Sequence, residues 1–455
     1  MLAEELPMRI PLRRMIGALL LVGAVALSGG LASAAGEEAA TIPPGTKITQ
    51  KNWEQYQQFM SEGMKAVFKG DHFWKFPDNI EIDIGPTVPI PLPSFFKSAT
   101  EANQNVTKIV AVGGGFVAEP YKTGLPFPDP LKGDPSQIGQ RIFWDLWYRF
   151  HPRVEEAPNC SYVLDQFGNM TRTADEIIAF SQLSHLTDPG FPENDPNAGP
   201  YYYVAYAEQV APEAGKYTTT LNLLLQDPRA EPELYEFVPT LRRSLRLSQS
   251  ARCAPLFGTD LTFDDNFEGP PGLPQLFDIK YVGEKKLITL VHGDTHSFDT
   301  CGTASNVDSR YYYMGSKGIV PFPNPGSGAW ELRDVYVLSL KRLPQNSPGY
   351  CYGNRLLYVD KENFFPDQFD LYDAAGNLYK WNATLLRPYP MPGGKPGDQV
   401  ISISGQNTAY CVNFQDKHVT VFIGLHGCIN NDCQAQGYTD ATRWALPEGL
   451  SKIMQ

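Results

Sequence analysis

The sequence predicts a mainly β protein with flanking helices, built around an antiparallel sheet. Its 455 residues include 40 Gly and 39 Pro, which favour turns, and 23 Tyr and 25 Phe, which favour strands. From Tyr201 onward, short apolar runs follow one another, and hairpin-length turns such as Asp373–Asn377 separate them. Links of this length favour an antiparallel meander over a fold of alternating strands and helices.

Helices and an extended arm are expected before these strands. From Lys51 to Lys69, apolar residues recur at the spacing of one helical face, with Thr49 as the expected N-cap and Gly70 as the expected end. Residues 84–97 contain too many prolines for a helix or an inner strand, and we expect an extended arm over the surface.

Two further helices are expected after the arm, over Thr100–Val106 and over the aromatic run Ile142–Phe150. Gly113–Gly115 separates them. The second helix carries large apolar side chains on most of its faces, which predicts that it is buried.

The predicted strands include one with a clear alternation, Leu332–Leu340, whose outward-facing set keeps two valines. This pattern is expected for a sheet that is covered on part of its second face. The full set of expected strands is Tyr201–Glu208, Tyr217–Leu225, Leu234–Leu247, Leu276–Val291, Leu332–Leu340, Leu356–Val359, Phe369–Tyr372 and Leu378–Leu386, with two more strand-like runs and a polar helix within Val400–Leu446.

The N-terminus has the pattern of a secretory signal peptide. Three arginines precede the uncharged apolar run Met15–Leu27, and small residues follow as far as Ala34. The run is shorter than the roughly 20 residues that span a bilayer. We therefore expect residues 1–34 to be a signal peptide cleaved near Ala34, and the mature protein to be periplasmic.

Charge and cysteine content narrow the classes of protein further. The formal net charge is −12, which argues against nucleic acid as a partner. Seven cysteines in an exported protein should mostly form disulfides, with one left over. Cys428 and Cys433 flank a short turn and are the best local pair. Cys301 with Cys351, and Cys160 with Cys253, are possible further pairs, and the sequence does not fix the connectivity.

Two groups of residues suggest metal chemistry. His292, Asp294 and His296 lie close together after an expected strand and carry zinc-type ligand atoms, although their spacing matches no metallohydrolase signature. His418 and His426 with the Cys428–Cys433 pair form a second candidate set, for which a disulfide is the competing use. No Walker loop, dinucleotide-binding glycine motif or G-x-S-x-G sequence is present, and we expect no cofactor.

Candidate ligand-binding residues are cationic or aromatic. Arg242, Arg243 and Arg246 are the most suggestive polar residues, because guanidinium groups at a cavity mouth bind phosphate or carboxylate head groups. A solvated strand end paired with Glu233 or Asp264 is the alternative. The aromatic candidates for lining a cavity are Trp144, Trp147 and Tyr336.

Several distinctive motifs follow one another along the chain. They are Lys122–Pro128 (KTGLPFP), Gly133–Pro135 (GDP), Ile142–Asp145 (IFWD), Leu234–Arg246 (LYEFVPTLRRSLR), Tyr281–Lys286 (YVGEKK), Trp330–Val337 (WELRDVYV), Arg355–Asp360 (RLLYVD) and Leu371–Leu378 (LYDAAGNL). In this order the motifs resemble a family of exported bacterial proteins, domain-of-unknown-function family 1329, described as outer-membrane lipoprotein-sorting-like. The resemblance covers roughly residues 48–387 and implies a LolA/LolB-like fold, in which a curved antiparallel sheet forms an incomplete barrel plugged by helices. It also implies binding of acyl chains in an apolar cavity.

The expected organisation is a signal peptide (1–34), an N-terminal helix and proline-rich arm (35–120), the curved-sheet domain (121–390) and a C-terminal extension with the cysteine loop (391–455). The leading hypothesis is a non-enzymatic periplasmic shuttle for a lipid-like or hydrophobic molecule. The resemblance suggests a resistance-nodulation-division-type exporter or an outer-membrane protein as its partner. A metal-assisted or acid–base hydrolase and a structural accessory of an envelope complex are the alternatives.

Overall fold

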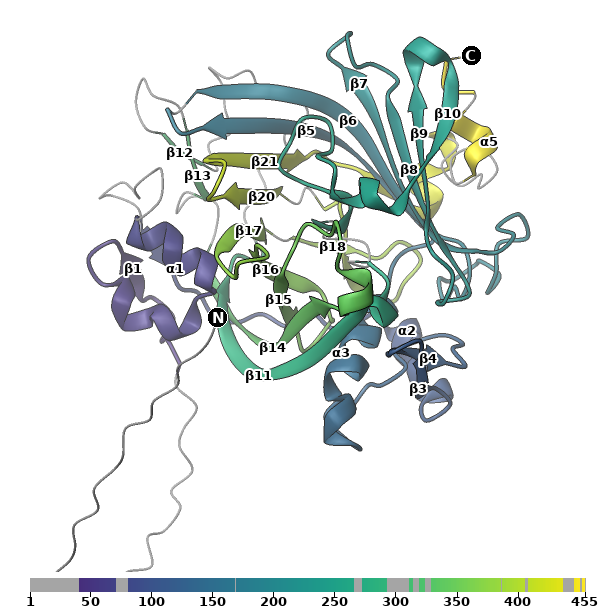
Figure 1. Ribbon diagram of the computed structural model, residues 1–455. Coiled ribbons are helices and arrows are strands. Elements are labelled where there is room, and N and C mark those ends of the chain that lie inside the picture. Colours follow the sequence, from purple (N-terminus) through teal and green to yellow (C-terminus); the bar gives the residue numbers. More distant parts are fainter. Residues whose placement is uncertain are drawn as a thin grey trace, which may run out of the picture. The chain divides into compact units, whose positions relative to one another are not determined.

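A large curved antiparallel sheet holds most of the strands in the computed structural model (Figure 1). The structure describes residues 41–70, 81–167, 169–265, 272–292, 311–313, 319–323, 329–385, 387–405, 408–436, 446–450 and 452–454, so the expected signal peptide lies outside the described residues. Within them the sheet has 14 strands. In pairing order these are β10 (Arg243–Leu247), β9 (Glu233–Val238), β8 (Thr219–Leu225), β7 (Tyr201–Ala211), β6 (Met170–Gln182), β5 (Val154–Asp165), β21 (His418–Gly424), β20 (Thr408–Asn413), β17 (Leu378–Leu385), β16 (Pro366–Tyr372), β15 (Asn354–Asp360), β14 (Glu331–Arg342) and β11 (Phe277–Thr289), and β22 (Cys428–Ile429) also pairs with β5.

The order of the strands shows how the sheet is assembled. Two meanders, one of β5–β10 and one of β11 and β14–β17, are joined by the β20–β21 hairpin, which pairs with β17 on one side and β5 on the other. In this order β10 and β11 occupy the two ends, and no pairing joins them in the described chain. The sheet is therefore open, and the predicted mainly β fold with a curved antiparallel sheet is confirmed.

The hairpin position corrects the expected boundary at residue 390. Residues 408–424 lie inside the sheet rather than in an extension beyond it. The two strand-like runs expected after Val400 are therefore real strands, but they complete the sheet that the earlier strands begin.

Smaller elements surround the sheet. Four two-stranded sheets are described: β1 (Lys47–Thr49) with β2 (Glu81–Asp83), β3 (Lys108–Val112) with β4 (Gly115–Glu119), β12 (Tyr311–Tyr313) with β13 (Ile319–Pro323), and β18 (Pro388–Pro390) with β19 (Gln399–Ile401). The α-helices are α1 (Glu62–Lys69), α2 (Ser94–Asn103), α3 (Ile138–Trp147) and α5 (Pro447–Leu450). Short 3-10 helices are η1 (Trp53–Phe59), η2 (Pro135–Gln137), η3 (Pro239–Leu241), η4 (Gln249–Cys253), η5 (Phe263–Asp265), η6 (Pro274–Leu276), η9 (Pro344–Asn346) and η10 (Asn430–Gln436).

The single helix expected over Lys51–Lys69 is divided into η1 and α1. Met60 between them is extended, and Ser61 caps α1 by accepting a hydrogen bond from Met64 N. Gly70 ends α1 in a left-handed conformation, as predicted, whereas Thr49 does not cap it. Asp370 of the sheet accepts hydrogen bonds from Glu62 N at 2.9 Å and from Gly63 N at 2.8 Å, which holds the helix start against β16.

Other expectations change in detail. The helix expected over Thr100–Val106 is α2, which begins earlier, at Ser94. The extended arm, expected over residues 84–97, therefore ends at Pro93. The expected strand Leu234–Leu247 is the β9–β10 hairpin, because Pro239 opens η3 and Arg242 turns the chain with φ +49°. The strands β5 and β6, which precede Tyr201, were not among those expected.

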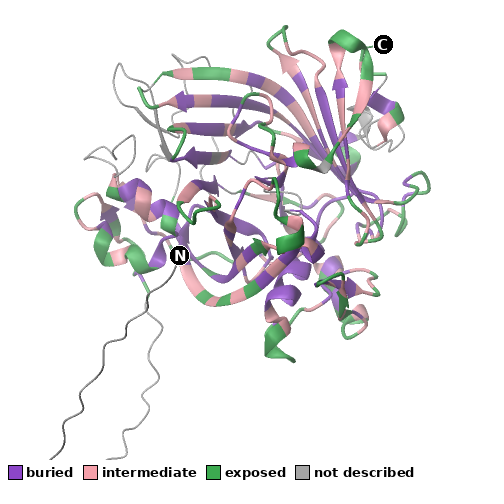
Figure 2. Cartoon of the chain, viewed as in Figure 1, coloured by how far each residue is buried: buried purple, intermediate pink, exposed green. Residues whose placement is uncertain are grey.

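Apolar packing occurs on both faces of the sheet, and buried residues follow most of its strands (Figure 2). Helix α3 is buried along nearly its whole length, as its composition predicts, and packs with β14 and β15 in one core. Trp381 belongs to a second core with η1 and α1. No helix in the described residues is long and apolar enough to cross a membrane.

Candidate functional site

A cavity of about 150 Å³ lies between the sheet and the segment 254–265, which we call the cover segment. Strands β5 to β8, β17, β20 and β21 contribute its wall. The lining residues are Ala157, Asn159, Glu176, Ile178, Phe180, Ala205, Tyr206, Ala207, Thr220, Asn222, Thr384, Ile403, Ala409, Phe422 and Gly424, with Leu256, Phe257, Leu261, Thr262, Phe263 and Asp265 from the cover segment.

The cavity arises from small side chains on one face of the sheet. Alternate residues of a strand point to the same face, so Ala205 and Ala207 of β7 both line the cavity. Their cross-strand partners Asn222, Thr220 and Ile178 continue this face. Alanine at these positions leaves volume that a leucine or phenylalanine would fill, and the remaining lining is predominantly apolar.

The cover segment is held in shape by its own hydrogen bonds. Leu256 N donates to Leu261 O at 2.8 Å, and Thr259 N donates to Leu256 O at 2.9 Å. Thr262 N and its hydroxyl both donate to Asp265 Oδ2, at 3.0 and 3.1 Å. These bonds form a compact loop whose apolar residues, Leu256 and Phe257 at a half-exposed rim and Leu261 beneath it, are presented to the cavity.

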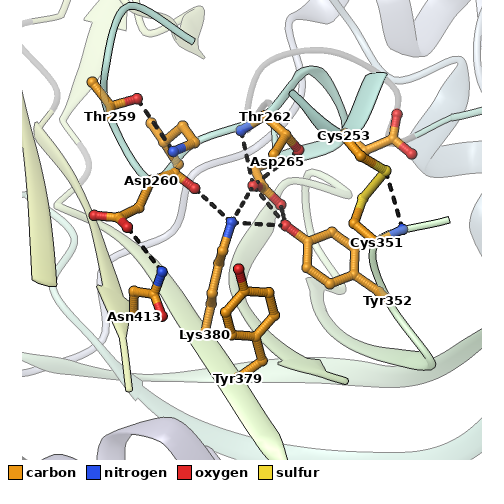
Figure 3. Close-up of polar contacts among 12 residues, drawn as sticks. Cys253, Thr259, Asp260, Thr262, Asp265, Cys351, Tyr352, Tyr379, Lys380 and Asn413 are labelled. Atoms are coloured by element: carbon orange, nitrogen blue, oxygen red, sulfur yellow. Dashed lines mark hydrogen bonds and ion pairs between the residues drawn. A yellow bond between two sulfur atoms is a disulfide. The ribbon is translucent and has the colours of Figure 1, made fainter. Parts of the chain in front are cut away.

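Lys380 of β17 attaches the cover segment to the sheet (Figure 3). Its ammonium group donates to Asp260 O at 2.5 Å and to Tyr352 Oη at 3.2 Å, and lies 3.4 Å from Asp265 Oδ2. Burial is the largest single influence and would lower the pKa of Lys380, but Asp265 together with Cys411, Tyr379 and Asp260 keeps the pKa above its ordinary value. The lysine is therefore charged and paired, and it is not available as a nucleophile.

The Asp260 side chain adds a second attachment. Its carboxylate accepts a hydrogen bond from Asn413 Nδ2 at 2.8 Å (Figure 3). It also accepts one from Thr420 Oγ1 at 2.9 Å. Asn413 and Thr420 belong to β20 and β21, the hairpin that joins the two meanders. The cover segment thus contacts each of the three central strands.

Two further links hold the ends of the cover segment. Arg252, just before it, contacts Asp264 Oδ1 at 2.6 Å, and Arg355 of β15 donates to Asp264 O at 2.6 Å. Burial would raise the pKa of Asp264, but Arg252 and Arg355, together with Tyr350 and Arg342, hold this pKa below its usual value. The second link is covalent: Cys253, which directly precedes the cover segment, forms a disulfide with Cys351.

Glu176 is the unusual polar group of the cavity wall. Asn159 Nδ2 donates to its Oε2 at 2.8 Å, and the Ser161 hydroxyl donates to the same carboxylate at 3.0 Å. Burial raises the pKa of Glu176 to about 7, against these two hydrogen bonds, which lower it. No described cation pairs with this carboxylate.

The structure places the residues that the sequence singled out for ligand binding away from this cavity. Arg242, Arg243 and Arg246 lie exposed in the β9–β10 hairpin, where Arg246 pairs with Glu233 at 3.1 Å. Trp144 and Trp147 are buried in α3, and Tyr336 of β14 is buried in the same apolar core. The arginines do not share one face, because Arg242 belongs to the turn.

The metal candidates are placed only in part. His292 Nδ1 lies 2.8 Å from Glu331 Oε1, while Asp294 and His296 lie outside the described residues. His418 and His426 lie at opposite ends of β21. Cys428 and Cys433 form a disulfide, so they offer no thiolates and the second candidate zinc set is excluded.

The cysteine expectations have mixed outcomes. The Cys428–Cys433 pair is the one that the short loop predicts. The two possible further pairs are wrong, because Cys253 pairs with Cys351. Cys160 is also disulfide-bonded, and Cys411 is the free cysteine in the described part of the chain.

The sequence-based reasoning missed Lys380, Asp260 and the small residues of β7. Asp264 and Asp265 were visible as adjacent carboxylates, but their partners Arg355 and Lys380 are about a hundred residues away. The alanines at Ala205 and Ala207 carried the only local signal, since they occupy alternate positions in an otherwise bulky strand.

Together these features define a mainly β protein with a covered, largely apolar cavity on its sheet. The chain matches the family described as "Protein of unknown function (DUF1329)" over residues 47–431, and it belongs to that family, as its motifs predict. No curated protein matches the sequence.

Solved structures with similarity to the chain come from several bacteria. One is a putative outer membrane lipoprotein-sorting protein domain from Vibrio parahaemolyticus, with 14% identity and a TM-score of 0.43 over 65% of this chain and 94% of that one. A DUF1329 family protein from Desulfovibrio piger has 12% identity and a TM-score of 0.44 over 68% and 97%. A LolA superfamily protein from Nitrosomonas europaea has 13% identity and a TM-score of 0.34 over 64% and 94%.

Proposed function

We propose that this protein binds a hydrophobic molecule in the covered cavity and carries it outside the cytoplasm. The observation that supports this most directly is the set of small and apolar side chains that keep a cavity open beneath the cover segment. Cores normally pack to the density of organic crystals, so a retained apolar cavity suggests a ligand rather than a packing requirement.

The size of the cavity limits how much ligand it holds as described. A cavity of about 150 Å³ accepts one ring or a short stretch of chain. Burying about 200 Å² of apolar ligand surface contributes about 5 kcal/mol before the cost of association. A longer ligand extends past the half-exposed Leu256 and Phe257, or displaces the cover segment.

The compartment and the partner are also part of the proposal. The signal-peptide pattern of residues 1–34 supports export to the periplasm, which cell fractionation tests. An exporter or outer-membrane protein is the proposed partner, and co-purification from a crosslinked envelope tests it.

Filling the cavity tests the binding role. Ala207→Phe places a ring in the space, and we expect it to abolish the fluorescence increase of the uncharged probe N-phenyl-1-naphthylamine. Ala374→Phe is the matched control, because it makes the same change in an exposed turn. Probe binding that survives in Ala207→Phe, or that is absent from the unaltered protein, contradicts the proposed function.

A further inference from the structure

The charged side chains in the described lining of the cavity are all acidic. Among the residues that the structure describes, its lining includes two carboxylates, Glu176 and Asp265, and no lysine, arginine or histidine. Asp265 is neutralised by Lys380, which reaches it from behind the lining. The hydrogen-bond partners of Glu176 within the described chain, Asn159 and Ser161, are both neutral.

Two other polar atoms of the lining have no hydrogen-bond partner within the described structure. They are Oδ1 of Asn222 on β8 and Oγ1 of Thr384 on β17, and their residues are 6% and 5% exposed. Buried polar groups are nearly always hydrogen-bonded, because an unpaired one costs about 1–3 kcal/mol. Both residues belong to the cavity lining, although these two atoms are themselves shielded from solvent.

From these observations we propose, on the basis of the proposed function, that the cavity selects an apolar molecule ending in a hydroxyl group over the same molecule ending in a carboxylate. A hydroxyl donates a hydrogen bond, so it is a suitable neighbour for a carboxylate such as that of Glu176. A ligand carboxylate would be buried without a cation and near the Glu176 carboxylate, which is costly in a site of low polarity.

A pair of ligands with the same chain tests this selection. The experiment measures displacement of N-phenyl-1-naphthylamine by 1-decanol and by decanoate at pH 8, where decanoate is ionised. We expect decanol to bind at least about ten-fold more tightly, as repulsion between two anions in a partly buried site predicts. Equal binding, or tighter binding of decanoate, overturns the inference.

Glu176→Gln identifies the residue responsible. It keeps the size of the side chain and removes its charge, and we expect it to reduce the preference for decanol by about ten-fold. Asp175→Asn is the neighbouring control, since Asp175 directly precedes Glu176 in β6, is absent from the cavity lining and pairs with Arg172. An unchanged preference in Glu176→Gln assigns the selection elsewhere and overturns the role of this carboxylate.

The outcomes for the two proposals are distinct. Binding of the probe with no preference for the alcohol contradicts the selection and leaves the carrier role standing. Absence of probe binding contradicts both. The ratio measured for the unaltered protein decides the selection even where a variant fails to fold.

Discussion

Lys380→Met is expected to destabilise the protein strongly, because it removes the cation that holds the cover segment. Lys380 is 3% exposed and Asp265 is 1% exposed, so solvent does little to screen the pair. The substitution keeps the length of the side chain but leaves the Asp265 carboxylate buried, and its remaining hydrogen-bond partners in the described chain are Tyr352 and Thr262. Breaking a buried ion pair in this way costs about 3–5 kcal/mol.

Urea unfolding measures this loss as a lower midpoint at an unchanged denaturant slope. Lys132→Met is the control, because Lys132 makes an ion pair with Asp129 while 79% exposed, and such pairs contribute at most about 1 kcal/mol. Adding Asp265→Asn removes the uncompensated carboxylate, so the double variant should lose at least about 1 kcal/mol less than the sum of the single losses.

The reasoning fails if Lys380→Met costs less than about 1 kcal/mol, since a buried pair of this geometry cannot then be holding the cover segment. It also fails if the two substitutions are additive, because additivity means that the two side chains do not interact in the folded protein.

Three further results are expected. Glu176 has a folded pKa of about 7, above its ordinary value of 4.5, so its contribution to stability is present below pH 4.5 and is lost as the pH rises to about 7. The free energy of unfolding of Glu176→Gln, measured with urea, should therefore rise by about 3 kcal/mol relative to that of the unaltered protein between pH 4 and pH 8. A difference between the two proteins that stays constant with pH contradicts this. Gly63→Ala should destabilise by at least about 1–3 kcal/mol, because its Cβ would lie 2.2 Å from Cγ of the buried Trp381; an unchanged thermal midpoint would show that the helix shifts freely. Replacing Cys253 and Cys351 together by serine should lower the free energy of unfolding by about 2–4 kcal/mol, because their disulfide closes a loop of 98 residues. The same double variant should release the probe faster in stopped-flow measurements. Equal release rates would mean that the disulfide does not hold the cover segment.

The sequence predicted the part of the fold that local patterns determine. The alternation in Leu332–Leu340 and the turn at Asp373–Asn377 gave β14 and the β16–β17 hairpin, because side-chain period and turn chemistry are local properties. The sequence did not predict β5 and β6, because these strands contain buried glutamates that break the expected apolar pattern, namely Glu155, Glu156 and Glu176.

Local sequence patterns predicted little of the candidate site. Its cover segment is attached by Lys380 and Cys351, which lie far along the chain from Asp265 and Cys253. The predicted arginine site rested on treating Leu234–Leu247 as one strand, and the turn at Pro239–Arg242 separates those residues. The cavity depends on which side chains are small on a shared face, and that requires the register of neighbouring strands.

Native mass spectrometry of the protein purified from periplasm tests the central claim most directly, with the Ala207→Phe variant measured in parallel. We expect the unaltered protein to retain an apolar molecule that organic extraction releases, and the variant to be free of it. A protein that is ligand-free in both forms, or a ligand retained equally by both, contradicts the assignment of the covered cavity as the binding site.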